Sequence, residues 1–258
     1  MGSAYREIEG THAWNGMTIH GLIDTGSNIS VLHMHSALGK AMKQSATTGA
    51  KRQVTFQQKT CQAEDVTISG YSVNEGVVLP PFVCTMLDLT LAIANFPTGI
   101  DLILGTNALR GQIVQFHRSR TPRFIRAPPS KFYQVKLVSG PCKTGQKNLG
   151  KLFLVATEHN GSMIADTGNK FSSFCDPDMC NGVVKIVLFK PTSPHKTHNV
   201  TIQQNMVRHL TLPKSLSMIE NWCPKRITGN LGIDVWAGLF TSTVFDFKNH
   251  NMYCSPNN

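Results

Sequence analysis

The sequence predicts an all-β protein built from two lobes, with a few short helices. Three observations support this fold class. Short apolar segments alternate with polar residues along most of the chain, long helical periodicity is scarce, and one ordered set of motifs occurs in each half. A chain of 258 residues has room for two domains of about 125 residues each, so its length is compatible with two lobes.

The composition fits a β-rich protein with a basic surface. Charged residues make up 16% of the chain, below the usual ~25%, and Ser, Thr, Asn and Gln take their place. The formal net charge is +10, and basic residues gather between positions 118 and 136. No RNA-binding aromatic motif, zinc-finger spacing or helix-turn-helix pattern accompanies them. We interpret this run as a solvated linker and expect no nucleic-acid partner. We also expect no membrane-spanning segment, since no apolar stretch approaches the ~20 residues that crossing requires.

The first repeated motif contains Asp-Thr-Gly. Residues 14–32 and 159–174 each begin with an Asn-Gly turn and continue into a short apolar strand. Asp-Thr-Gly follows this strand at residues 24–26 and again at residues 166–168, and a second alternating strand comes after it. A single Asp-Thr-Gly is common by chance, but two copies in matching surroundings indicate an internal duplication.

The second repeated motif is a pair of residues before a glycine, followed by a short segment and a strand. It occurs at residues 101–116, where the glycine is Gly105, and at residues 230–247, where it is Gly232. Gly105 lies 81 residues after the first Asp of the motif above, and Gly232 lies 66 residues after the second. The order of motifs is therefore the same in both halves.

Tandem prolines mark the boundary between the halves. We predict an N-terminal lobe over residues 1–127, a linker over 128–130 and a C-terminal lobe over 131–258. Residues 132–138 alternate like a strand that starts the second lobe or joins a sheet shared by both. Further strands are predicted at residues 54–56, 66–68, 77–79, 82–84, 185–189 and 200–203. Short helices are predicted near residues 34–44, 106–111, 204–210 and 214–220.

These repeated motifs resemble those of the aspartic peptidases. The resemblance covers the order of elements along most of the chain, and close matching is confined to residues 14–32, 101–116, 159–174 and 230–254. The first half looks more like a retropepsin lobe, and the C-terminal strand looks like that of pepsin-like enzymes. The resemblance implies a two-lobed pepsin-like acid protease fold with a cleft between the lobes.

The resemblance also implies the catalytic residues. Asp24 and Asp166 would face each other and hold one water molecule between them. Two carboxylates so close cannot both ionise cheaply, so they share a proton. One would take a proton from the water while the other donates one to the substrate carbonyl, and the pair titrates as a unit.

Neighbouring residues would support this pair. By resemblance, Thr25 and Thr167 form hydroxyl-to-backbone hydrogen bonds that lock the two loops together, and Ser27 donates to the outer oxygen of Asp24. Gly26 and Gly168 permit a tight turn and let backbone amides approach the carboxylates.

The sequence departs from the pepsin pattern in its net charge of +10 and in two places along the chain. Asn169 stands where the second loop usually has Thr or Ser, although its amide can still donate a hydrogen bond. The hairpin expected to form the flap, within residues 54–68, has no Tyr and no Gly at its tip. Water exclusion and substrate clamping would then be weaker, or would be done by Gln57, Gln58 and Lys59, the candidate flap residues.

The sequence therefore predicts an aspartic endopeptidase that cleaves polypeptides in an extended conformation, as a monomer, without a cofactor or metal, and that binds pepstatin-type inhibitors. A catalytically silent homologue that binds peptides or a protein in its cleft is the alternative. The histidine pairs at 33/35 and 195/198 lack zinc-ligand spacing, and we interpret them as surface residues.

Seven cysteines leave the redox compartment open. The pairs 175/180, 61/84 and 223/254 are candidate disulfides, and free buried thiols are the alternative. Of three glycosylation sequons, those at Asn160 and Asn199 favour a secreted or vacuolar protein, and the third, at Asn28, lies in the predicted active-site turn. A cytoplasmic, viral or retroelement origin stays open.

Overall fold

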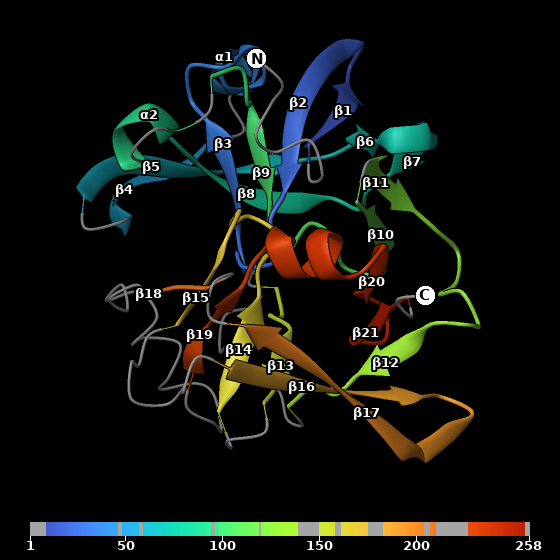
Figure 1. Cartoon of the computed structure of the whole chain (residues 1–258). Helices are drawn as coiled ribbons and strands as arrows, with labels where there is room; N and C mark the ends of the chain where they lie inside the picture. The colour runs from blue at the N-terminus through green and yellow to red at the C-terminus, as the bar shows by residue number, and fades with distance from the viewer. Residues whose placement is uncertain are drawn as a thin grey trace.

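The chain folds into strands and a few short helices, as Figure 1 shows. The computed structural model describes residues 9–45, 48–56, 59–93, 96, 98–118, 120–138, 150–157, 161–174, 183–203, 207–209 and 227–255. None of the helices in these ranges is long and apolar enough to cross a membrane. The described strands form three sheets, of nine, seven and five strands.

The nine-stranded sheet comes entirely from the first half of the chain. Its order is β4-β5-β8-β3-β9-β2-β1-β6-β7. These strands are β1 (Glu9–Trp14), β2 (Met17–Ile23), β3 (Ser30–His33), β4 (Thr48–Phe56), β5 (Lys59–Ile68), β6 (Ser72–Val73), β7 (Val77–Val78), β8 (Phe82–Leu87) and β9 (Leu102–Leu104).

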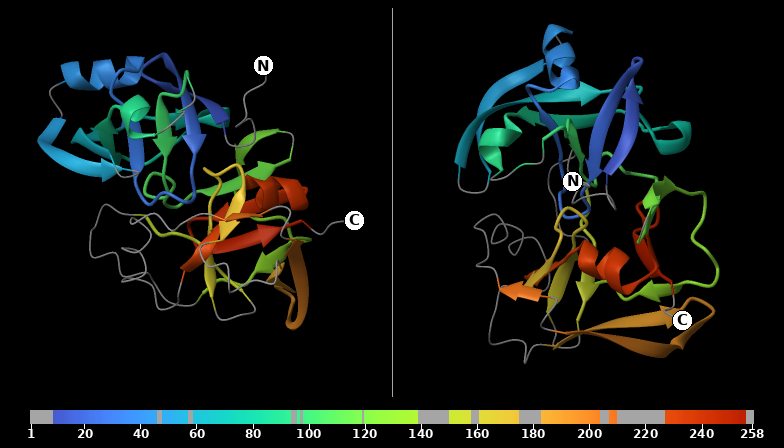
Figure 2. Two further views of the ribbon diagram at one scale, coloured as in Figure 1. Left: turned by 60° about the vertical axis from the view of Figure 1, so that its left-hand side comes forward. Right: turned by 45° about the horizontal axis from the view of Figure 1, so that its top comes forward.

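The five-stranded sheet comes from the second half, in the order β13-β14-β19-β15-β18. It contains β13 (Leu154–Ala156), β14 (Ser162–Ala165), β15 (Ser172–Phe174), β18 (Val207–His209) and β19 (Ile227–Leu231). Figure 2 shows this sheet and the nine-stranded sheet at opposite ends of the molecule. Each of these two sheets contains the strand that leads into one Asp-Thr-Gly loop.

The seven-stranded sheet draws strands from both halves, in the order β11-β10-β20-β21-β12-β16-β17. It contains β10 (Ile113–His117), β11 (Arg120–Phe124), β12 (Tyr133–Val135), β16 (Val183–Lys190), β17 (Ser193–Gln203), β20 (Ser242–Asp246) and β21 (Asn251–Cys254). β10 from the first half pairs with β20 from the second over five residue pairs. Residues 128–130, the predicted linker, lie between β11 and β12 of this shared sheet.

The helices are short. α1 (Ala37–Gln44) begins at Ser36, whose hydroxyl caps it by accepting a hydrogen bond from the Gly39 amide at 3.0 Å. Leu38 and Met42 are one turn apart on its buried face. The other helices in the described ranges are η1 (Asn74–Gly76), α2 (Leu89–Ala92) and η4 (Asp234–Leu239), the last wound as a π-helix.

Two predicted helices are wrong. Residues 106–111 form consecutive turns, which end at Gly111 with a φ of 77°. Within the predicted helix 204–210, Val207–His209 forms β18, which pairs in parallel with β15. Residues 214–220 lie outside the described residues.

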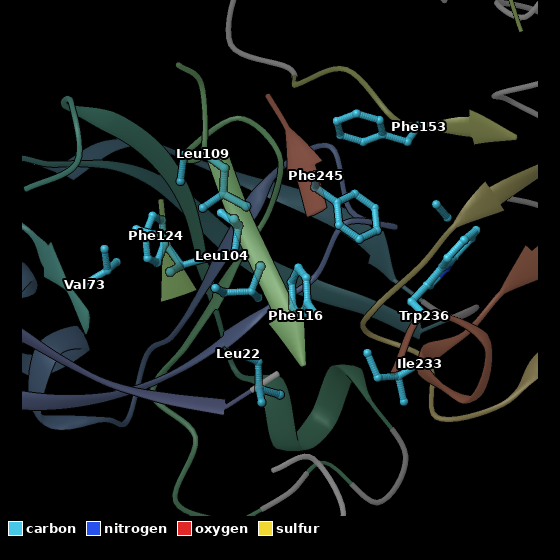
Figure 3. Packing of buried hydrophobic residues seen from close by; sticks show 14 of the residues in the cluster. Leu22, Val73, Leu104, Leu109, Phe116, Phe124, Phe153, Ile233, Trp236 and Phe245 are labelled. Carbon is cyan, nitrogen blue, oxygen red and sulfur yellow. The ribbon is translucent and has the colours of Figure 1, made fainter. Parts of the chain in front are cut away.

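The hydrophobic core continues from one half into the other. Phe116 on β10 packs edge-to-face against Phe245 on β20, with ring centroids 5.4 Å apart, and Phe153 meets the same ring at 5.3 Å. Figure 3 shows these rings gathered with Leu104 and Trp236. Because the core and the seven-stranded sheet both include residues from each half, the two ends of the molecule are packed as one unit.

Two candidate disulfides are wrong, because Cys61, Cys84 and Cys254 are free buried thiols. Cys84 on β8 lies opposite Val66 on β5, five residues along the strand from Cys61. At about 3.4 Å per residue, that offset is far beyond the reach of a disulfide. Burial raises the pKa of the Cys254 thiol to about 12. The other four cysteines lie outside the described residues.

Candidate active site

Each Asp-Thr-Gly loop begins at the end of an interior strand of its sheet. β2 runs into Asp24 and pairs in parallel with β9, and β14 runs into Asp166 and pairs in parallel with β19. The Asp24 amide donates to Leu104 O at 2.9 Å, and the Asp166 amide donates to Leu231 O at 2.8 Å. The leucine before Gly105 and the leucine before Gly232 therefore hold the two aspartates in equivalent ways.

The two loops are joined by their threonines. Thr25 Oγ1 donates to Ala165 O at 2.6 Å and accepts from the Thr167 amide at 3.0 Å. Thr167 Oγ1 donates to Ile23 O at 2.7 Å and accepts from the Thr25 amide at 3.1 Å. Both threonines are fully buried, so these four hydrogen bonds are shielded from water. They fix one loop against the other with approximate twofold symmetry.

The glycines leave space for the carboxyl group of the opposite loop. A Cβ atom at Gly26 would lie within 2.7 Å of the three carboxyl atoms of Asp166. A Cβ atom at Gly168 would lie within 2.6 Å of the same atoms of Asp24. Only glycine fits either position, and the arrangement places the two carboxyl groups face to face.

The electrostatics of the pair are those of two carboxyl groups competing for one proton. Burial raises the pKa of Asp24 well above its usual range, and the charge of Asp166 and a hydrogen bond between the two carboxyl groups raise it further. The backbone amides of Gly26 and Ser27 act in the opposite direction. Asp24 therefore keeps a proton more readily than an exposed aspartate does.

Asp166 receives amide donors from two asparagines. The Asn169 backbone amide donates to its Oδ1 at 3.2 Å, and the Asn169 side-chain amide donates to its Oδ2. The Asn230 side-chain amide donates to the same Oδ2 at 2.9 Å. Sequence reasoning missed Asn230. The available signal was that Asn230 occupies, within the repeated motif, the position of the apolar Ile103.

Ser27 differs from expectation. Its hydroxyl donates to Ile29 O at 2.7 Å, two residues along its own loop. A hydroxyl has a single proton to donate, so it does not donate to Asp24 in this arrangement. The donors around Asp24 are instead backbone amides, with Gly26 N at 2.9 Å from Oδ1.

A pair of serines supports the loops from outside, and sequence reasoning did not identify it. Ser30 Oγ accepts from the Gly105 amide at 3.1 Å and donates to Asn107 Oδ1 at 2.8 Å. In the other half, Ser172 Oγ accepts from the Gly232 amide at 2.8 Å and donates to Asp234 Oδ1 at 2.7 Å. Each serine lies six residues after the aspartate of its loop, so the repeat extended further than the motifs alone indicated.

No protein-family model and no curated protein matches the sequence. The structure, however, is similar to the crystal structure of basic 7S globulin from soybean. The TM-score is 0.51, the match covers 96% of this chain and 89% of that chain, and the sequence identity is 11%. The chain has the pepsin-like aspartic protease fold. The predicted fold class and the resemblance to the aspartic peptidases are thereby confirmed, at the level of fold alone.

Within this pepsin-like fold, the predicted flap falls on the hairpin of β4 and β5. The strands pair antiparallel from Thr48 and Val66 to Phe56 and Lys59, at one edge of the nine-stranded sheet. Gln57 and Gln58, at the tip, lie outside the described residues, as does the side chain of Lys59. Their role as a flap stays a prediction.

His33, the last residue of β3, and His35 form a small polar cluster with Asp88. His35 Nε2 lies 3.2 Å from Asp88 Oδ2, and His33 Nδ1 accepts a hydrogen bond from the Leu89 amide at 3.2 Å. Burial lowers the pKa of His33. Among the described residues, no group of three His, Cys, Asp or Glu side chains is placed to hold a metal ion. The side chains of His195 and His198 lie outside the described part of the structure.

Proposed function

We propose that this protein is an aspartic endopeptidase whose catalytic groups are Asp24 and Asp166. The observation that carries the proposal is the facing pair of carboxyl groups, which share a hydrogen bond on loops cross-linked by Thr25 and Thr167. The fold alone does not require two acidic groups in contact, and their mutual repulsion makes the arrangement costly. A water molecule held between the two carboxyl groups would have a proton donor on one side and a proton acceptor on the other.

The chemistry needs no covalent intermediate with the protein. The ionised carboxyl group takes a proton from the water as the water oxygen bonds to the carbonyl carbon of the substrate. The protonated carboxyl group gives its proton to the carbonyl oxygen, which produces a gem-diol. When the C–N bond breaks, one proton passes to the leaving amine and one returns from a diol hydroxyl, so the pair regains its starting state.

We propose a polypeptide as the substrate class. Because both carboxyl groups belong to one chain, a monomer supplies the complete site. We expect a polypeptide bound in an extended conformation, and we expect pepstatin-type inhibitors to bind as analogues of the gem-diol.

A silent peptide-binding homologue is the second candidate, and the flap favours it. Residues 48–68, which include the hairpin, contain no tyrosine. Tyr71, the next tyrosine along the chain, is fully buried, and its hydroxyl lies 2.7 Å from His12 Nδ1 in the core. It therefore does not substitute for a flap tyrosine, and substrate would be held by other groups.

The experiment is cleavage of a diverse peptide library between pH 3 and 7. Asp24→Asn and Asp166→Asn should each lower cleavage by at least about 100-fold, because each removes either the acid or the base. Circular dichroism and thermal melting of each variant control for folding. Cleavage that survives either substitution contradicts the paired-carboxyl proposal. Peptide binding without cleavage by the well-folded unmodified protein would support the silent homologue instead.

A further inference from the structure

We propose that Asn230 is a positioning residue that fixes the ionised state on Asp166, so that Asp166 acts as the base and Asp24 as the acid. This inference rests on the proposed function for its kinetic consequence. The order in which the two carboxyl groups ionise is nevertheless a property of the folded protein, and it can be measured without any cleavage.

The position of Asn230 makes its amide a fixed donor. It lies on β19, one residue before Leu231, whose carbonyl accepts from the Asp166 amide. Asn230 is only 8% exposed, and its Nδ2 lies 2.9 Å from Asp166 Oδ2. Its place in the sheet fixes the backbone and burial restricts the side chain, so water does not replace this hydrogen bond.

The first half of the molecule has an apolar residue at the position equivalent to Asn230. Ile103 precedes Leu104 as Asn230 precedes Leu231, and the two leucine carbonyls accept equivalent bonds from Asp24 and Asp166. Ile103 is buried and packs with Val31 and Leu87, and it has no polar atom to offer Asp24. The near-symmetric site is therefore asymmetric at this position.

A side-chain NH₂ group only donates, so it stabilises an ionised carboxylate more than a protonated one. Asp166 accepts such donors from Asn169 and Asn230 and a backbone amide in addition, whereas the donors around Asp24 are backbone amides. Hydrogen bonds to a charged group are the stronger kind. The shared proton is thus held on Asp24.

The other charged groups near the second loop do not oppose this assignment. The carboxylate of Asp234 is occupied by the amide and hydroxyl of Ser172, at 2.7–3.0 Å. The ammonium group of Lys170 lies over the ring of Phe171, 5.4 Å from its centroid. Asp24 is the other ionisable group across the site, and the charge of an ionised Asp166 makes Asp24 hold its proton more firmly.

The consequence for the reaction is an assignment of roles. Asp166 takes the proton from the water as the O–C bond forms, and Asp24 passes its proton to the carbonyl oxygen. When the C–N bond breaks, Asp166 returns its proton to the leaving amine, and Asp24 regains one from the diol hydroxyl. Protons and charge balance over the cycle.

The test is a ¹³C NMR titration of protein labelled at the aspartate carboxyl carbons. Asp24→Asn and Asp166→Asn variants assign the two signals. In the unmodified protein, the first ionisation of the pair should move the Asp166 signal. If the Asp24 signal moves first, the inference is overturned. Once the signals are assigned, the titration of the unmodified protein alone decides this point.

Asn230→Ile gives position 230 the residue that the first half has at its equivalent position. It should raise the pH of the first ionisation by roughly one to two units, the value of a lost hydrogen bond to a charged group. Thr228→Val is the matched control, since Thr228 is buried two residues earlier on β19 and donates only to Ser162 O, at 3.2 Å. An unshifted titration in a folded Asn230→Ile protein overturns the inference.

Kinetics supply the second readout. In Asn230→Ile the acid limb of the kcat/KM profile should move to higher pH by the same one to two units, and in Thr228→Val it should stay in place. A merely structural role would lower activity without moving the limb, which would contradict the inference. If the protein cleaves nothing but the titration behaves as expected, the proposed function fails while the assignment of the ionised carboxyl group stands.

Discussion

At the residue scale, the site depends on side chains that cross from one loop to the other. Thr25 and Thr167 each make one hydrogen bond as donor and one as acceptor across the junction. Their removal leaves buried amide and carbonyl groups without partners, and such groups cost more than the average hydrogen bond contributes.

We therefore expect Thr25→Val, which keeps the shape and removes the hydroxyl, to lower the free energy of unfolding by about 2–4 kcal/mol. Thr167→Val should behave alike because its bonds are equivalent. Urea unfolding followed by circular dichroism measures the change. Thr228→Val removes a single longer bond and should cost less than either. Equal losses for Thr228→Val and Thr25→Val would argue against a special role of the cross-loop bonds.

Some residues of the site could be predicted from the sequence and others could not. Asp24 and Asp166 could be found because an acid in a repeated motif is visible in one dimension. The hydroxyl of Ser27 was expected at Asp24 and instead bonds to Ile29, because a short side chain can reach either acceptor. Asn230 was missed because its function depends on the side-chain contact across β14 and β19, which the sequence does not show.

At the element scale, each Asp-Thr-Gly loop packs closely against a glycine, Gly105 in the first half and Gly232 in the second. A Cβ atom at Gly105 would lie within 2.9 Å of three backbone atoms of Ser27 and Ile29. Backbone atoms in a hydrogen-bonded loop cannot move aside as a flexible side chain can. Gly105 is therefore needed for the close approach of β9 to the first Asp-Thr-Gly loop.

Gly105→Ala should lower the free energy of unfolding by about 1–3 kcal/mol through overpacking, and should also displace Asp24 and reduce activity. Gly238→Ala is the control, because a Cβ there meets only Ile233 O at 3.8 Å, an ordinary contact. Thermal melting compares the two variants. If Gly105→Ala melts like Gly238→Ala, the close packing of this loop does not limit stability.

Strands were easier to predict than helices for a physical reason. Alternation identifies a half-buried strand, and the predicted strands at residues 54–56, 66–68 and 185–189 all lie within observed ones. Residues 106–111 have helix-compatible composition, but Thr106 N donates to Ser27 O. This tertiary hydrogen bond holds the segment as turns against the first loop.

At the scale of the whole molecule, stability also depends on buried groups outside the catalytic pair. His12 is 2% exposed, its Nδ1 contacts Tyr71, and its Nε2 has no hydrogen-bond partner. Burial, with a smaller contribution from His20, lowers the pKa of His12 to about 4. The folded protein thus keeps this ring neutral at pH values where the unfolded chain protonates it.

Between pH 6.5 and about 4 the unfolded state binds a proton that the native state does not, so stability should fall as pH falls through this window. The expected loss is about 3 kcal/mol. Asp24, whose pKa is raised, acts with the opposite sign. Comparing His12→Gln with the unmodified protein at each pH isolates the histidine. Parallel stability curves for the two proteins would contradict this account.

The internal repeat of motifs made the two-lobed fold predictable from the sequence. Two ordered sets of motifs imply two similar halves, and the structure joins them through β10, β20 and the shared core. The predicted disulfide between Cys61 and Cys84 was wrong because the sequence does not reveal strand register, which places these two residues far apart.

The central claim is one complete aspartic peptidase site per chain. Titration of peptide cleavage with a tight pepstatin-type inhibitor tests it most directly, with protein concentration known and mass measured in solution. We predict that cleavage ends at one inhibitor per monomeric chain, because Asp24 and Asp166 form the site within one molecule. An end point at one inhibitor per two chains, or cleavage that the inhibitor does not stop, would contradict the account.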